Sequence, residues 1–317
     1  MNTSPITLDA AAVDRLLPHV DVLQEMRQLF MDLGQSQAVQ PPQTLTLLPE
    51  DKGDFITYLG AITKAGVFGA KLSPYLVTDS KPIITAWTVL MSTETGQPLC
   101  LCDAGRLTTE RTVATTALAV DLLAQKDVRS LAIIGSGPVA AAHWRYVQGL
   151  RPWQQVHIYS PNLSSDQKNL AHWQSICPNG ILADSAEAAV KGVDVVMLCT
   201  ASGTPVVDYN ALEANVLVTS ISTNVSRAHE ISPAFITSAQ TYCDYRATTP
   251  DTAGEMILAA QDHGWKPSDL CGDLAELSNG SCPLPNSDKP IFFRSVGLGL
   301  EDVAIANSIY RAACAKQ

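Results

Sequence analysis

Two basic side chains of this 317-residue chain stand where proton transfer or carboxylate binding is feasible. Lys71 lies in the apolar run of residues 69–72, where burial would lower the pKa of its amine and allow it to donate or accept a proton. Arg111 is the only basic residue in the small-residue run 108–116, from which it could form a bidentate pair with a carboxylate. Structural alternatives remain open, because Lys71 could reach water along its stem and Arg111 could pair with Glu110 or Asp103.

A glycine turn follows the apolar residues 131–134 and precedes a segment that can form a helix. Gly135 would make the tight turn, Gly137 would let a pyrophosphate approach the backbone, and Ala140 would let the helix pack on the strand. The phosphates would then bind free N–H groups at the helix N-terminus. The sequence therefore predicts a dinucleotide site.

The pattern of elements changes along the chain and predicts two parts. Residues 9–17, 20–33 and 107–124 have the apolar spacing of helices, and short strands are expected at 44–48, 55–61, 67–72, 83–92 and 99–103. From 131 to about 245 strands and helices alternate, with strands at 155–159 and 193–199, as in a parallel sheet. Helices are expected at 251–260 and 267–277, and a last one near Gly299, whose first turn carries Glu301 and Asp302.

The bulk composition excludes several classes of protein. A net charge of −10 argues against nucleic acid or an anionic membrane as partner, and no stretch approaches the roughly 20 apolar residues of a membrane span. Residues 1–14 do not resemble a signal peptide. The eight cysteines show no C-x-x-C spacing and no clustering with histidine, so we expect no metal and a cytoplasmic location.

Six motifs together resemble the ornithine cyclodeaminase/mu-crystallin family, nearly end to end. They occupy residues 39–41, 69–71, 107–112, 135–137, 187–195 and 295–302. The most specific are the pair Arg111-Thr112 and the closing Ser-x-Gly-x-x-x-Glu-Asp. The resemblance implies an α/β fold, with a Rossmann dinucleotide-binding domain and a smaller α+β substrate and dimerisation domain. We expect residues 1–120, completed by a C-terminal helix at 296–317, to form the substrate domain, and residues 121–295 the Rossmann domain.

The same resemblance implies roles for individual residues. Lys71 would be the catalytic proton donor or acceptor, Arg111 would bind the substrate α-carboxylate, and Thr112 would lie near the nicotinamide-side phosphates. The remaining substrate site is predicted at Gln43, Thr85, Asn224 and Gly297. The cofactor is predicted to contact Thr112, Gly135, Ser136, Gly137, Pro138, Val139, Ala140, Ser160, Asn162, Cys199, Thr200, Ala201, Ser220, Ile221 and Val296.

Three positions depart from the family pattern. Gln43 stands where the family usually has a second carboxylate-binding arginine, a role for which Arg227 and Arg294 are candidates. Asn224 aligns with an aspartate of cyclodeaminases, and an amide does not take up a proton as a carboxylate does. The end of the second Rossmann strand, near Ser160, has neither the acid typical of NAD sites nor the arginine typical of NADP sites. We favour NADP over NAD, because nothing at Ser160 repels a phosphate.

These observations predict an NAD(P)H-dependent oxidoreductase, assembled as a homodimer, that reduces a 2-imino acid to an L-amino acid. The substrate would be a cyclic ketimine or an open-chain imine such as iminosuccinate. One alternative is an ornithine cyclodeaminase that uses NAD internally, and another is a cofactor-bound regulatory protein of low turnover. Trp87 is assigned to the core of its strand, and His229-Glu230 to a surface turn.

Overall fold

The computed structural model describes residues 4–222, 227–286 and 288–315, so Asn224 lies outside the described residues. The chain divides into two compact units. Unit 1 comprises Met1–Ala114 and Gly297–Gln317, and unit 2 comprises Thr115–Val296. The division falls inside the long helix α3 (Gly105–Leu123).

Unit 1 is built on a mainly antiparallel sheet with the strand order β1-β8-β7-β5-β4-β2, in which β3 also pairs with β4 and β6 with β5. Only β1 and β8 pair in parallel among the strands described for this sheet. The strands are β1 (Ile6–Leu8), β2 (Ala38–Val39), β3 (Thr44–Leu47), β4 (Gly53–Ile62), β5 (Val67–Leu76), β6 (Ile83–Ile84), β7 (Trp87–Ser92) and β8 (Pro98–Asp103). The turn between β7 and β8 closes the predicted hairpin.

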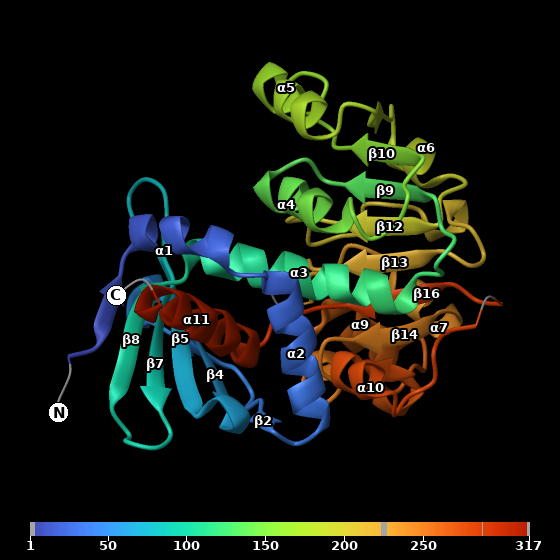
Figure 1. Cartoon of the computed structure of the whole chain (residues 1–317). Coiled ribbons are helices and arrows are strands. Elements are labelled where there is room, and N and C mark those ends of the chain that lie inside the picture. Colours follow the sequence, from blue (N-terminus) through green and yellow to red (C-terminus); the bar gives the residue numbers. More distant parts are fainter. Residues whose placement is uncertain (1–3, 223–226, 287, 316–317) are drawn as a thin grey trace. The chain divides into compact units, whose positions relative to one another are not determined.

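One face of this sheet packs against the C-terminal helix α11 (Gly299–Cys314), which contacts β4, β5 and β7 (Figure 1). Helix α2 (Val22–Gly34) packs on α11, and α1 (Ala10–Leu16) lies against α11 and β8. Asp9 and Asp21 cap α1 and α2 by accepting backbone N–H groups, as N-cap residues do. Short 3₁₀ turns are η1 (Leu17–His19), η2 (Pro49–Asp51) and η3 (Thr63–Ala65).

The opposite face of the unit 1 sheet carries large apolar side chains that remain exposed. Exposed and buried residues alternate along the four neighbouring strands β4, β5, β7 and β8. The exposed apolar residues are Leu59, Phe68, Leu72, Trp87 and Leu101. Trp87 is 36% exposed, so its assignment to the core was wrong. The pairing register explains this, since Trp87 stands opposite exposed Leu72, whereas the next residue in the strand stands opposite buried Lys71.

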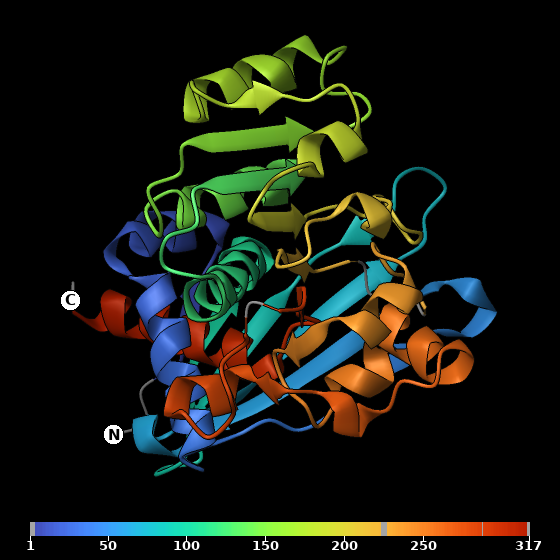
Figure 2. The same cartoon turned by 90° about the vertical axis from the view of Figure 1, so that its right-hand side faces the viewer.

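Unit 2 contains a parallel sheet in the order β11-β10-β9-β12-β13-β16-β14-β15 (Figures 1 and 2). Its strands are β9 (Ser130–Ile134), β10 (Gln155–Tyr159), β11 (Ile181–Leu182), β12 (Val195–Leu198), β13 (Leu217–Ser220), β14 (Gln240–Cys243), β15 (Gly272–Asp273) and β16 (Ile291–Arg294). The central strands β9, β12, β13 and β16 are buried along their whole length. Parallel strands buried on both faces read as continuous apolar runs, as here.

Helices connect the strands of unit 2. They are α4 (Pro138–Val147), α5 (Gln167–Ile176), α6 (Ala186–Val190), α7 (Pro233–Ser238), α8 (Thr249–Thr252), α9 (Gly254–Asp262) and α10 (Leu274–Asn279), with 3₁₀ turns η4 (Tyr209–Ala211) and η5 (Pro267–Asp269). Among the described residues, no helix is both long enough and apolar enough to cross a bilayer.

Three predicted elements differ from the structure. The helix expected at 251–260 is divided at Ala253 into α8 and α9. The strand expected at 83–92 is interrupted after β6, so Thr85 lies outside any strand. The helix expected at 267–277 is wrong, because Gly272 and Asp273 pair with β14 as a strand. Asp273 then begins α10 through a capping box with Glu276, in which each side chain accepts the other residue's backbone N–H.

Candidate functional site

Lys71 is a buried amine in the middle of β5. Lys71 is only 1% exposed, so the alternative in which its side chain extends to place the amine in water is excluded. The Nζ atom lies 2.9 Å from Asp302 Oδ2, 3.3 Å from Thr108 Oγ1, and 4.2 Å from the ring centroid of Tyr58, its cross-strand neighbour. The amine is therefore held by an anion, a hydroxyl and an aromatic face at once.

The pKa of Lys71 is lowered to about 8. Burial is the largest cause, and the charge of Arg111 lowers the pKa further, while Asp302 opposes both by stabilising the cation. An amine whose pKa is near neutrality exchanges a proton far more readily than an ordinary surface lysine does.

Arg111 projects from α3 into the same cluster and is 4% exposed. Its Nη1 donates to Glu301 Oε2 at 2.8 Å and its Nε to Asp302 Oδ1 at 3.0 Å. Burial alone would lower the pKa of Arg111, but the charges of Asp302 and Glu301 outweigh it, so the pKa is raised and the guanidinium stays charged. The predicted alternative of a pair with Glu110 or Asp103 is wrong, because the carboxylates come from α11.

Close packing of α11 on the sheet brings these carboxylates into place. A Cβ added to Gly299 would meet the backbone of Leu59 at 2.4 Å, and one added to Gly60 would meet Leu300 Cα at 2.6 Å. Gly297, with φ +82°, lies against Arg111, since a Cβ there would stand 2.3 Å from Nη1. Only glycine fits this backbone conformation and this space together.

Unit 2 carries a separate pocket of about 920 Å³, within the range typical of small-molecule sites. It lies where β9 leads through the glycine turn into α4. Gly135 has φ +118°, and its Cα faces the carbonyl oxygen of Cys199 so closely that a Cβ would lie 2.4 Å from it. Gly137 occupies the N-cap position of α4 and has no side chain that could accept a hydrogen bond. Among the described residues no side chain caps this helix, so the N–H groups of its first turn are available to a ligand.

Helix α5 holds the glycine turn from behind. Asn169 Nδ2 donates to Ser136 Oγ at 2.9 Å, and Trp173 Nε1 donates to the carbonyl oxygen of Ser136 at 2.9 Å. Ser136 is thereby fixed through both its side chain and its backbone.

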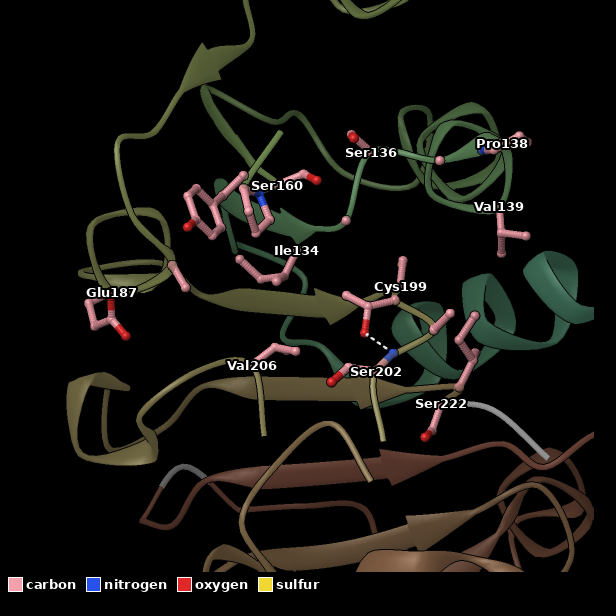
Figure 3. A pocket seen from close by; sticks show the side chains of 18 residues that line it. Ile134, Ser136, Pro138, Val139, Ser160, Glu187, Cys199, Ser202, Val206 and Ser222 are labelled. Atoms are coloured by element: carbon pink, nitrogen blue, oxygen red, sulfur yellow. Dashed lines mark hydrogen bonds between the residues drawn. The ribbon is translucent and has the colours of Figure 1, made fainter. Parts of the chain in front are cut away.

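Most of the residues predicted to contact the cofactor line this pocket (Figure 3). Those that do so are Gly135, Ser136, Gly137, Pro138, Val139, Ser160, Cys199, Thr200, Ala201 and Ile221. The pocket is completed by residues that the sequence did not single out, namely Ile134, Tyr159, Pro161, Ala186, Glu187, Ser202, Val206 and Ser222. Glu187 is the one acidic side chain in the lining as described.

Other predicted residues lie elsewhere. Ala140 is buried behind the turn, Asn162 is exposed, and the backbone N–H of Val296 donates to Asp244 Oδ2. Gln43 is partly exposed and Thr85 is exposed, and in the described part of the chain neither forms a hydrogen bond with Lys71, Arg111 or Asp302. Thr112 belongs to unit 1, and its nucleotide contact stays a prediction.

Arg294, one candidate for the second carboxylate ligand, is buried in unit 2, where its Nε lies 2.8 Å from Glu255 Oε1. This arginine already has a carboxylate partner. Arg227, the other candidate, adopts φ +62°, and its carbonyl oxygen contacts the ring of His229.

Three carboxylates central to these clusters were missed by sequence reasoning. Glu301 and Asp302 were interpreted as charges suited to the start of a helix and as the end of the closing family motif, and not as partners of Arg111 and Lys71. Two acids followed by the apolar run of residues 303–306 are a sign of burial. Glu230 was assigned to a surface turn, which was wrong, because it is fully buried. It accepts hydrogen bonds from Thr200, Ser220 and Ser222.

A model of the ornithine cyclodeaminase/mu-crystallin family matches residues 6–317. The chain belongs to this family. Over 308 residues it is 53% identical to an NAD(P)H-dependent anabolic L-arginine dehydrogenase of Pseudomonas aeruginosa, with 97% of each chain covered. The family membership that the motifs predicted is thus confirmed.

This member of the ornithine cyclodeaminase/mu-crystallin family is similar in fold to several solved structures. The Δ¹-pyrroline-2-carboxylate reductase of Thermococcus litoralis, in complex with NADH and L-proline, aligns with a TM-score of 0.89 at 21% identity, covering 98% of both chains. An archaeal alanine dehydrogenase dimer with bound NAD aligns with a TM-score of 0.89 at 23% identity, covering 98% of this chain and 97% of the other. Both confirm the predicted α/β fold.

Proposed function

We propose that this protein is an NAD(P)H-dependent oxidoreductase that reduces a 2-imino acid to an L-amino acid. The observation that carries the proposal is the buried cluster of Lys71, Arg111 and Asp302, which supplies a titratable amine beside a fixed guanidinium. A reductase of imino acids needs both, one for the proton and one for the α-carboxylate. A protein that only binds its ligand has no use for an amine tuned toward neutrality.

The pocket of unit 2 fits a nicotinamide dinucleotide. The glycine turn, the uncapped start of α4 and the cavity volume agree with a pyrophosphate site. Gly137 tests this directly, because its φ of −71° suits any residue and a Cβ there meets nothing within 4 Å. We expect Gly137→Val to fold normally and to lose nucleotide affinity, measured by calorimetry. Unchanged affinity would place the nucleotide elsewhere.

We favour NADP over NAD as the cofactor, and two observations support this preference. Ser160 at the end of β10 introduces no negative charge, and the similar arginine dehydrogenase is described as NAD(P)H-dependent. The ratio of kcat/KM values for NADPH and NADH measures the preference.

Residues of unit 1 would bind and protonate the substrate. Glu301 and Asp302 hold Nη1 and Nε of Arg111, so the Nη2 edge, which they do not use, would bind the α-carboxylate. Cationic Lys71 would donate a proton through Nζ to the imine nitrogen. The bound nicotinamide supplies the hydride.

Since the donor must be the cation, the kcat/KM for reduction falls as pH rises through about 8, where Lys71 loses its proton. In the oxidative direction Lys71 must be neutral, and activity falls as pH drops below the same value.

Among 2-imino acids, we propose the one that gives L-arginine, because the arginine dehydrogenase of Pseudomonas aeruginosa shares 53% identity over nearly the whole chain. The balanced reaction joins the 2-oxo acid of arginine, ammonium, NAD(P)H and a proton to give L-arginine, water and NAD(P)⁺. The test offers this oxo acid with ammonia, beside pyrroline-2-carboxylate, piperideine-2-carboxylate and iminosuccinate, and follows nicotinamide absorbance. No oxidation with any of them would contradict the proposed function.

The cyclodeaminase alternative predicts a different result. It requires ammonia release from L-ornithine with no net change in nicotinamide absorbance. We expect no appreciable conversion of ornithine to proline, because an amide replaces the expected acid at position 224. Substituting Asn224→Asp should restore little, since Gln43 also departs from the cyclodeaminase pattern.

We further propose that two copies associate through the exposed apolar face of the unit 1 sheet. Leu59, Phe68, Leu72, Trp87 and Leu101 form a continuous patch of the kind that marks an interface, and an alanine dehydrogenase of this fold is a dimer. Phe68→Asp is expected to convert the dimer to a monomer in sedimentation experiments. We also propose a cytoplasmic location, which the free cysteines support.

A further inference from the structure

Glu230 joins two loops that line the pocket of unit 2. Its carboxylate is fully buried, and it accepts four hydrogen bonds from neutral donors. Oε1 accepts from the backbone N–H of Thr200 at 2.6 Å and from Thr200 Oγ1 at 2.7 Å. Oε2 accepts from Ser220 Oγ at 2.7 Å and from the backbone N–H of Ser222 at 2.8 Å. The two oxygens therefore serve the ends of β12 and β13 respectively.

These bonds fix the orientation of the lining backbone. In a trans peptide the C=O points opposite to the N–H. With the N–H of Thr200 turned to Glu230, the carbonyl of Cys199 turns the other way, to the side where it meets Gly135. By the same geometry the carbonyl of Ile221 points away from Glu230, and Ile221 lines the pocket.

The carboxylate also orders the next residues through a relay. Thr200 Oγ1 donates to Glu230 and accepts the backbone N–H of Ser202 at 3.1 Å, the bond dashed in Figure 3. In addition, the carbonyl oxygen of Glu230 accepts the N–H of Val206, another lining residue. One residue thus holds the segment 200–206 and the start of the loop after β13.

We propose that Glu230 is the positioning residue for the nicotinamide half of the cofactor, an inference that rests on the proposed nucleotide site. In the strand–turn–helix arrangement, the pyrophosphate lies at the glycine turn and the adenosine ribose at the end of the second strand. Here these are Gly135 to Gly137 and Ser160, which directly follow β9 and β10. The opposite half of the dinucleotide then lies along residues 199–202 and 221–222, which follow β12 and β13 and which Glu230 holds together.

The test compares NADH with ADP, a fragment that carries the adenosine and two phosphates but lacks the nicotinamide riboside. Glu230→Gln keeps the shape but replaces one acceptor oxygen by an NH₂ group, which faces two donors whichever way the amide turns. We expect the Kd for NADH to rise about tenfold, while the Kd for ADP stays within about twofold. Glu213→Gln is the matched control, because Glu213 is exposed and its one described side-chain bond, from the N–H of Gly192, lies away from the lining residues.

A second variant covers the case in which Glu230→Gln does not fold. Thr200→Val removes the hydroxyl relay and leaves the carboxylate its three other bonds. It should weaken NADH about three- to fivefold with ADP unchanged, and Thr200→Ser should restore the affinity. Equal weakening of both nucleotides, or of neither, would overturn the inference. If the native protein bound neither nucleotide, the proposed function would fail instead.

Discussion

Asp302 in unit 1 and Glu230 in unit 2 are both buried carboxylates, and they differ in what surrounds them. Asp302 lies between two cations, with Lys71 at 2.9 Å and Arg111 at 3.0 Å. Glu230 has only neutral N–H and O–H donors among its described hydrogen-bond partners. A carboxylate beside two cations shifts their pKa values and so decides which groups hold protons. A carboxylate that accepts only from neutral donors instead fixes the position of the backbone and hydroxyl groups that donate to it. The two units therefore use the same chemical group for different purposes.

The largest expected effect comes from removing the titratable amine. Lys71→Met should lower turnover by about 10²- to 10⁴-fold, the usual contribution of proton transfer, with little change in nucleotide affinity. Lys64→Met is the control, since Lys64 pairs with Asp32 and its side chain is half exposed. Steady-state kinetics and calorimetry on both variants measure this, and near-normal turnover of Lys71→Met would assign the proton to another group.

Arg111→Lys keeps the charge and loses the planar fork. A lysine cannot bond Glu301 and Asp302 as Nη1 and Nε do and still present a further edge to a carboxylate. We expect the substrate KM to rise about 10- to 100-fold, the loss of one charge-assisted bond or two. An unchanged KM would show that the α-carboxylate binds elsewhere.

Asp302→Asn tests, through the pH dependence of activity, whether Asp302 controls the protonation of Lys71. Asp302 raises the pKa of Lys71, so its neutral replacement should lower that pKa below about 8. The decline of reductive kcat/KM with rising pH should then begin at lower pH. Glu301→Gln should shift the profile less, because Glu301 is the smallest of the causes acting on Lys71. A profile that does not move in Asp302→Asn would remove Lys71 as the titrating group.

The smallest effect is expected in unit 2. Ser220→Ala removes one of four neutral donors to Glu230 and should cost about 1 kcal/mol of unfolding free energy, measured by denaturant titration. Its pH profile should match that of the native protein. A shifted profile would mean that Glu230 participates in proton transfer, and the contrast between the two carboxylates would be lost.

Local signals predicted the glycine turn, because a strand, two glycines and a helix lie within ten residues. The carboxylate partners of Arg111 were not predicted, since they lie 190 and 191 residues away in the chain and only the docking of α11 brings them near. Glu230 was misassigned for the same reason, as its donors come from the ends of two other strands. The exposure of Trp87 was not predicted either, because the alternation of side chains along a strand does not show which face of the sheet is covered by other elements.

Unit 1 is discontinuous, and this governs when its cluster can form during synthesis. The strands and α3 emerge first, followed by all of unit 2, and the residues of α11 come last. Until α11 has left the ribosome, Lys71 and Arg111 have no carboxylates, and two cations left in a half-built core repel each other. The residues that line the nucleotide pocket end at Ser222 and are synthesised well before that point, although β16, which pairs with β13 in the same sheet, comes just before α11. A nascent chain would therefore hold every lining residue of the nucleotide pocket before it holds the carboxylates that tune its acid.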